Sequence, residues 1–306
     1  MNNRFYNLTN DILFKATFAN QERIELLICL INALLKLEGQ EKIVEIELLN
    51  PFNDRDFFDD KLTIVDIKAK DAKNIVYNIE MQVQVPQYWE KRALYYASKL
   101  YTSQLEKGIS YNKLNKTISI SILNGICFPD SKEIHNLYTF HNNKTLESLD
   151  DLIELHFIEL PKFHKNKPDS LVSSFEKWLY ILKFGELYQK ESDMIPKELS
   201  DEKGISEAIQ AMQYVNSDAH VRDLIESREK YEHDQASFKE FYQEFYQDFY
   251  KKESEKVLEK GIEKGIEKGI AQVAIDLMKS TSMTDQEISN ITKLDLNKVK
   301  ELRLST

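Results

Sequence analysis

Apolar and polar positions alternate most regularly between Leu62 and Val85, where the pattern predicts two β-strands joined by a short turn. A polar cluster at residues 71–74 separates two runs rich in β-branched residues, which is typical of a hairpin. In the second run every other residue from Ile75 onward is apolar, so these residues share one face. The opposite face is polar and carries Asn78, Glu80, Gln82 and Gln84.

The position of the turn predicts the register of this hairpin. Residue 73, in the turn cluster, is the midpoint between Asp66 and Glu80. Antiparallel pairing about that point places the two carboxylates directly across from each other, with Cβ atoms about 5 Å apart. Facing carboxylates repel each other unless a cation lies between them, and oxygen ligands favour Mg²⁺ or Mn²⁺. The alternative is that both acids face solvent, as charges on antiparallel sheets commonly do.

Helices and further strands are predicted on both sides of the hairpin. Apolar spacing of one helical turn predicts helices after Asn10 and at 21–37, 88–107 and 170–184. Alternation predicts strands at 43–49, 116–123, 137–141 and 152–160. Within the helix at 88–107, Arg92, Tyr96 and Lys99 are spaced to share a face, where they would contact a phosphate backbone. The alternative is that the tyrosine packs in the core and Arg92 pairs with a carboxylate of the sheet.

The chain beyond residue 205 is predicted to be helical, and residues 238–250 form an amphipathic helix with one aromatic face. This aromatic face has to be covered by the preceding domain or by a second copy of itself, which predicts a homodimer as one solution. Its residues are Phe238, Phe241, Tyr242, Phe245, Tyr246, Phe249 and Tyr250.

A Glu-Lys-Gly-Ile repeat at 259–270 follows the aromatic face. Glycine at every fourth position predicts a marginal helix or a hinge, and we interpret the segment as a charged spacer. The last stretch, 271–306, resembles a small helix-turn-helix unit that opens with a capping box at Thr284 and Glu287. It has few basic residues, which favours protein contact over DNA contact.

Composition places the chain among globular proteins, with 42% hydrophobic and 30% charged residues in 306. No apolar run approaches the roughly 18 residues that span a bilayer, and the first residues lack the pattern of a signal peptide, so we expect a cytoplasmic protein without membrane contact. Cys29 and Cys127 are far apart and are expected to be reduced core thiols. A net charge of −10 argues against indiscriminate binding of nucleic acid.

Several short motifs occur together over most of the chain: Asp11-x-x-Phe14-Lys15-x-x-Phe18, Asp66-Ile-Lys-Ala-Lys-Asp71, Ile79-Glu-Met-Gln82, and Arg92-x-x-Tyr95-Tyr96 with Tyr101. Together with the Glu-Lys-Gly-Ile tail, they resemble the PD-(D/E)XK nucleases. More narrowly, they resemble the recombination-promoting nuclease (Rpn) and PD-(D/E)XK nuclease family transposases. The resemblance implies an α/β fold with a restriction-endonuclease-like core, a central mixed β-sheet flanked by helices, and a helical C-terminal extension.

The resemblance also implies a Mg²⁺-dependent DNA endonuclease, with Mn²⁺ as an alternative ion. Asp66, Glu80 and the main-chain carbonyl of Met81 would hold the metal, and Gln82 would position the attacking water. Gln82 stands where the wider superfamily usually has lysine, although the narrower family also carries glutamine there. Lys68, on the same face as Asp66, is a candidate substitute for that lysine, and Asp71, nearer the turn, is a weaker site candidate. Substrate contacts are expected from Lys15, Lys68, Arg92 and Tyr96.

We expect three segments: a nuclease-like domain at 1–235, the aromatic helix with the repeat linker at 236–270, and the helical tail at 271–306. The resemblance implies a role in recombination, transposition or defence against foreign DNA. A competing hypothesis is a catalytically degenerate module that binds DNA or protein through its helical C-terminal region. The neutral Gln82 and the acidic composition motivate this hypothesis.

Overall fold

The computed structural model describes residues 4–49, 66–105, 107–108, 110–149 and 152–305. The chain forms two compact units, Met1–Glu229 and Lys230–Thr306. The segment Leu62–Val65 at the start of the predicted hairpin and the acidic residues 53–60 lie outside the described residues. None of the described helices combines the length and the apolar character needed to cross a membrane.

A six-stranded mixed sheet forms the centre of the first unit, in the order β1-β2-β3-β4-β6-β5. The β1, β2 and β3 strands are antiparallel neighbours, β3, β4 and β6 are parallel, and β5 pairs antiparallel with β6 at the edge. The strands are β1 (Ile46–Leu48), β2 (Ile67–Asp71), β3 (Val76–Gln82), β4 (Thr117–Leu123), β5 (His135–Tyr138) and β6 (Ile153–Glu159).

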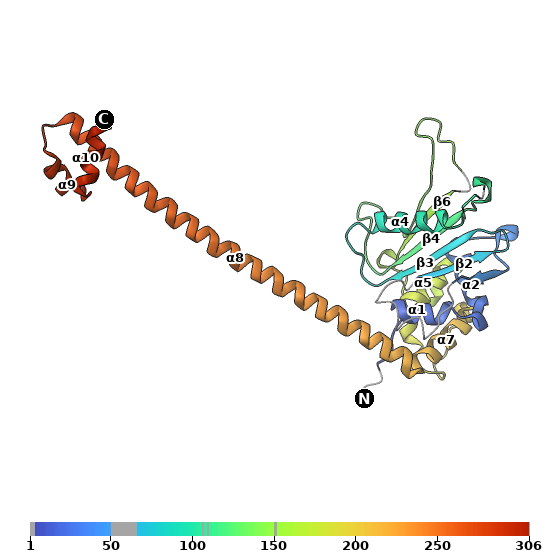
Figure 1. Ribbon diagram of the computed structural model, residues 1–306. Coiled ribbons are helices and arrows are strands. Elements are labelled where there is room, and N and C mark those ends of the chain that lie inside the picture. Colours follow the sequence, from blue (N-terminus) through green and yellow to red (C-terminus); the bar gives the residue numbers. More distant parts are fainter. Residues whose placement is uncertain (1–3, 50–65, 106, 109, 150–151, 306) are drawn as a thin grey trace. The chain divides into compact units, whose positions relative to one another are not determined.

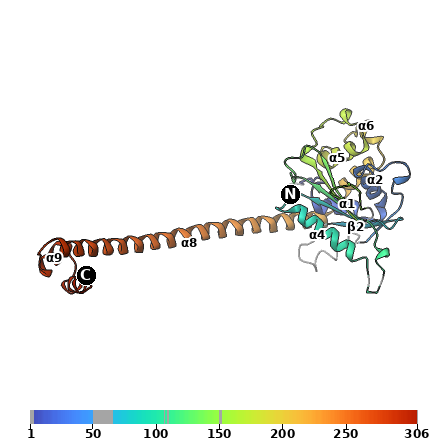
Figure 2. The ribbon, with the colours of Figure 1, turned by 90° about the horizontal axis from the view of Figure 1, so that it is seen from above.

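Helices cover both faces of this sheet (Figures 1 and 2). One layer contains α1 (Asp11–Phe18), α2 (Ile24–Leu34), α5 (Ser174–Phe184) and α7 (Ile205–Ser217), and the short α6 (Lys197–Ser200) packs beside α7. The other face is covered by α4 (Trp89–Thr102), which contacts β3, β4 and β6. The mixed α/β architecture with helices on both sides confirms the predicted fold class.

The main hydrophobic core lies between the sheet and the layer of α1, α2, α5 and α7. The sheet contributes its alternate apolar residues, because neighbouring side chains on a strand point to opposite faces. They include Ile67, Tyr77, Ile79, Met81, Ile118, Ile120, Ile122 and Ile158. Asn10 caps α1 by accepting a hydrogen bond from the Leu13 amide at 3.0 Å, so the predicted N-cap is confirmed.

The β2–β3 turn explains the hairpin register. The Asp71 carboxylate accepts hydrogen bonds from the amides of Lys73 and Ile75, both at 2.9 Å, and from the Tyr77 hydroxyl at 3.0 Å. Asn74 has a φ of 63°, a left-handed conformation that asparagine tolerates well. Asp71 is therefore a structural residue of the turn, on the face opposite to that of Asp66 and Glu80.

The second unit is built from a long helix and two short ones. The helix α8 (Ala219–Ser280) is continuous, so the Glu-Lys-Gly-Ile repeat is helical rather than a hinge. The tail contains α9 (Asp285–Thr292), with the predicted Thr284–Glu287 capping box, and α10 (Leu296–Leu304). Ala274, Ile288 and Val299 form the small core that joins these three helices.

Candidate active site

The antiparallel register pairs Ile67 with Ile79 and Lys68 with Asn78. Extended by one residue, this register places Asp66 across from Glu80, as the position of the turn predicts. Asp66 is almost completely buried and Glu80 is partly buried. The polar face of the hairpin therefore lies under α4 and does not face open solvent, contrary to the alternative considered from the sequence.

The environment of Glu80 disfavours its charged form. Burial raises the pKa of Glu80, and the negative charge of Asp66 raises that pKa further. A hydrogen bond from Asn78 and the charges of Arg92 and Lys68 act in the opposite direction without cancelling the rise. A cation between the two carboxylates would relieve this repulsion.

Asn78 is a site residue that has no role in the sequence prediction. It is only 2% exposed, and its side-chain amide donates a hydrogen bond to Oε1 of Glu80 at 3.0 Å. Ser121 is the register partner of Glu80 on β4, and Ser119 is the partner of Asn78. Both serines are buried, so a polar strip crosses from β2 through β3 to β4. The alternation of serine with isoleucine in β4 was the sequence signal for this strip.

Two cationic side chains border the carboxylate pair. The Nζ atom of Lys68 lies 3.4 Å from Oδ2 of Asp66, which places Lys68 on the predicted face. Arg92 projects from α4, where its guanidinium lies 5.5 Å from the ring centre of Tyr96 and 5.1 Å from that of Trp89. Because the Arg92 charge acts on Glu80, α4 brings a cation to the same side of the sheet as the carboxylates.

The other predicted site residues occupy different positions. Gln82 lies on the same face of β3 as Glu80, one strand repeat further on. The side chain of Met81 is buried in the core on the opposite face, so only its main chain is available to the site. Lys15 lies in the last turn of α1, in the layer on the other side of the sheet, and its substrate contact stays a prediction.

The donor set at the hairpin fits a hard divalent cation. Two carboxylates converge, and the neighbouring Oδ1 of Asn78 is buried without a hydrogen-bond partner in the described part of the chain. All of these donors are oxygen atoms, which Mg²⁺ and Mn²⁺ prefer. No group of three or more histidine, cysteine, aspartate or glutamate side chains suited to a metal ion occurs among the described residues. A cation here would rely on two carboxylates completed by main-chain oxygen and water.

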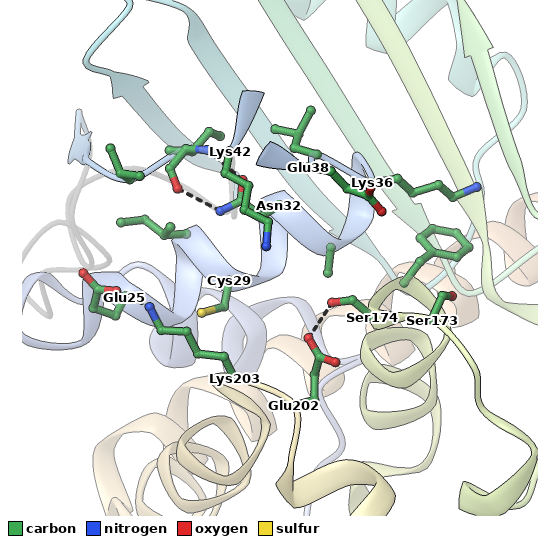
Figure 3. Close-up of a pocket in the computed structure, with 16 residues that line it drawn as sticks. Glu25, Cys29, Asn32, Lys36, Glu38, Lys42, Ser173, Ser174, Glu202 and Lys203 are labelled. Carbon is green, nitrogen blue, oxygen red and sulfur yellow. Dashed lines mark hydrogen bonds and ion pairs between the residues drawn. The ribbon is translucent and has the colours of Figure 1, made fainter. Parts of the chain in front are cut away.

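A separate cavity of about 620 Å³ lies in the other helical layer, between α2 and the start of α5. Figure 3 shows that its polar side chains pair largely with one another. Ser174 donates to Glu202 at 2.7 Å, and Lys203 lies 3.4 Å from Glu25. The Asn32 side chain bonds both the amide and the carbonyl of Ile43, at 2.8 Å each. These contacts hold the loop after α2 in place and converge on no common point.

Comparison with known proteins identifies the family. No curated protein and no solved structure gives a significant match to the chain. The family model described as PD-(D/E)XK nuclease family transposase matches residues 8–241, which include the whole sheet and every candidate residue of the site. Nucleases of the PD-(D/E)XK type generally use divalent metal ions. With the paired carboxylates of the hairpin inside the matched region, the chain belongs to the PD-(D/E)XK nuclease family transposases.

Proposed function

We propose that this protein is a Mg²⁺-dependent DNA endonuclease whose active site is centred on Asp66 and Glu80. The observation that carries the proposal is the hairpin register, which brings two buried carboxylates together under α4. The family supplies the reaction class, hydrolysis of a phosphodiester bond in DNA. We extend the proposal to a role in recombination, transposition or defence against foreign DNA, which the resemblance implies.

Each site residue has a role in this proposal. Asp66, Glu80 and the main-chain carbonyl of Met81 would hold the metal ion. When bound, a divalent cation supplies positive charge that lowers the pKa of a coordinated water and stabilises charge on the phosphate. The Gln82 amide would orient the attacking water by hydrogen bonding, because a neutral amide cannot act as a base at this pH range. Lys68, bound to Asp66, would supply the positive charge that a lysine at position 82 provides in the wider superfamily.

Substrate binding is assigned to side chains around the pair. Arg92 carries a guanidinium that can bind two phosphate oxygens at once, and Tyr96 supports it through the contact between the guanidinium and its ring. Lys68 would contribute a second phosphate contact, and Lys15 a third from α1. Binding through a few local cations is consistent with a chain whose net charge is −10.

The experiment is plasmid cleavage by the purified protein in the presence and absence of Mg²⁺. We expect cleavage by the wild type with Mg²⁺, and a loss of at least about 100-fold in the Glu80→Gln and Asp66→Ala variants, because removing a metal ligand removes charge stabilisation of several kcal/mol. Glu47→Gln serves as the matched control, because Glu47 lies on β1 with a side chain that is 70% exposed.

Thermal denaturation gives a second measurement that does not need turnover. An ion that binds only the folded state raises the melting temperature, so Mg²⁺ or Mn²⁺ should stabilise the wild type and the Glu47→Gln control but not Glu80→Gln. Cleavage that persists in both site variants would refute the assigned site. A wild type that neither cleaves nor responds to metal would favour the competing function, a binding module without catalysis.

We further propose that the chain self-associates through α8. Support comes from the aromatic face defined above, whose seven side chains are each more than half exposed in the described chain. Exposed apolar patches of this kind commonly mark protein contacts.

A further inference from the structure

A four-residue repeat runs along α8 for longer than the aromatic face or the Glu-Lys-Gly-Ile segment alone. Read in fours from Phe241, the first two positions are apolar in every repeat but one, and the last two are polar. The repeats are FYQE, FYQD, FYKK, ESEK, VLEK, GIEK, GIEK and GI, ending at Ile270. The aromatic pairs and the Gly-Ile pairs thus occupy the same phase of one continuous helix.

This period determines how two such helices can meet. An α-helix turns about 100° per residue, so a feature that recurs every four residues advances about 40° around the axis per repeat. Rows of residues four apart form ridges, and two sets of these ridges interlock at a crossing angle of about −50°. At such an angle two straight helices contact each other over only a few repeats. The contact therefore has a centre, and the helix should show where that centre lies.

The three glycines of the repeat mark this centre. A Cβ atom built on Gly261, Gly265 or Gly269 would meet no atom within 4 Å in the described chain, so no internal packing explains the absence of a side chain. Each glycine costs the helix up to about 1 kcal/mol relative to alanine. Ile262 and Ile266, beside them, are 54% and 58% exposed. A helix face that is both apolar and free of side-chain bulk suits the close approach of another backbone.

The charges of this segment are unfavourable for a helix on its own. Glu259, Glu263 and Glu267 lie four residues apart, as do Lys260, Lys264 and Lys268, and like charges at this spacing repel each other. In the described chain no ion pair joins these six side chains, whereas Asp248 and Glu253 upstream pair with Lys252 and Lys256. The glutamates border the isoleucine side of the apolar face, and the lysines border the glycine side.

We propose that two copies of this chain pair in parallel through the Gly-Ile face of residues 261–270. A two-fold axis along the helices brings the isoleucine side of one copy against the glycine side of the other. Each isoleucine then packs onto glycines of the second copy, and the glutamates of each copy face lysines of the other. Antiparallel pairing would instead set isoleucine against isoleucine and glutamate against glutamate, so the pattern selects the parallel arrangement. This pairing locates the centre of the self-association proposed above.

The decisive variant replaces all three glycines, Gly261→Ala, Gly265→Ala and Gly269→Ala, in the full-length protein. Alanine favours the helix of a single copy but holds two backbones apart. We therefore expect higher thermal stability of the helix by circular dichroism together with a twofold fall in mass by light scattering, from twice 36.0 kDa to one chain. An unchanged mass in this variant would overturn the proposal, as would a monomeric wild type.

Charge variants test the orientation. Converting the three glutamates to lysine should give a monomer, and exchanging the glutamates and lysines with each other should restore the dimer, because the exchange keeps opposite charges facing. In a background of Cys29→Ser and Cys127→Ser, Ile262→Cys and Ile270→Cys should each cross-link with their own kind. Cross-linking only in a mixture of the two would show antiparallel pairing and overturn the proposal.

Two further variants separate this inference from the proposals it accompanies. Glu80→Gln should abolish cleavage and leave the dimer intact, so failure of the nuclease assignment and failure of the pairing give different results. A Phe245→Ser, Tyr246→Ser variant keeps the Gly-Ile face and should remain dimeric. A dimer that is lost in this aromatic variant and kept in the glycine variant would place the contact on the aromatic face and overturn the inference.

Discussion

At the scale of single residues, Asn78 has the most specific environment in the site. Its buried side chain holds Glu80 through one hydrogen bond, and its remaining oxygen points to a place where no described residue satisfies it. A buried polar group in such a position restricts the carboxylate to one orientation. Asn78 is therefore a positioning residue for Glu80.

Replacing Asn78 with alanine should reduce the free energy of unfolding by about 1.5–3 kcal/mol, the range for a hydrogen bond to a charged group. Urea denaturation at neutral pH measures this change. Asn143→Ala is the matched control, because Asn143 is exposed and its loss should change the stability by less than about 0.5 kcal/mol. Equal stability of the two variants would show that Asn78 does not hold Glu80.

The sequence was sufficient to predict the carboxylate pair but not the residues that surround it. Asp66 and Glu80 belong to one hairpin, so local alternation and a turn of known position determine their register. The buried strip of Ser119 and Ser121 depends on parallel pairing between β3 and β4, which are separated by the whole of α4. No local pattern encodes such a pairing, and the hydrogen bond of Asn78 depends on burial that α4 provides.

At the scale of elements, β5 and β6 are joined by a histidine pair. His135 Nε2 and His156 Nδ1 lie 2.9 Å apart, and Glu154 lies 3.4 Å from the other nitrogen of His156. Burial, the His156 charge and the Lys36 charge lower the pKa of His135 from 6.5 to about 4. The rings stack on each other, and His135 also stacks on Phe175 of α5.

This pair predicts a loss of stability in mild acid. Because the pKa of His135 is lower in the folded state, the unfolded chain takes up the proton first. The contribution is complete above pH 6.5 and is lost progressively as the pH falls towards 4. Denaturation curves between pH 7.5 and 4 should show this slope in the wild type and a shallower one in His135→Gln. His164→Asn is the control, since His164 is exposed, and an unchanged slope in His135→Gln would contradict the assignment.

Helix α8 shows what element prediction from the sequence misses. The patterns divide residues 219–280 into a short helix, an aromatic helix and a spacer, because glycine and charge interrupt the apolar spacing. The structure has one helix throughout. Glycine weakens a helix by only about 1 kcal/mol, which long flanking helices tolerate. The sheet order β4-β6-β5 was likewise not predictable, because it depends on pairings between distant segments.

At the scale of the whole molecule, the first turns of α8 belong to the core of the first unit. Val221 and Ile225 are buried there, and Arg4 lies 2.9 Å from Glu229. The end of the nuclease-like unit is thus set by packing rather than by a change in composition. The family match extends beyond these residues, to 241.

Truncation tests this boundary. A chain ending at Tyr231 keeps Val221 and Ile225 and should unfold with nearly the stability of the same unit in the full-length protein. A chain ending at Ser217 loses both, at about 1.5–3 kcal/mol each, and should be clearly less stable in thermal or urea denaturation. Equal stability of the two truncated chains would show that α8 adds nothing to the first unit.

The short β2–β3 connection also has a consequence for how the protein folds. Closing a short loop costs little chain entropy, so Asp66 and Glu80 meet early, whereas β3 can pair with β4 only after the chain has closed over α4. Their mutual repulsion then acts on the nascent hairpin before the rest of the sheet exists. We expect dissolved divalent ions to speed refolding in the wild type, an effect that stopped-flow measurements on Glu80→Gln should lack.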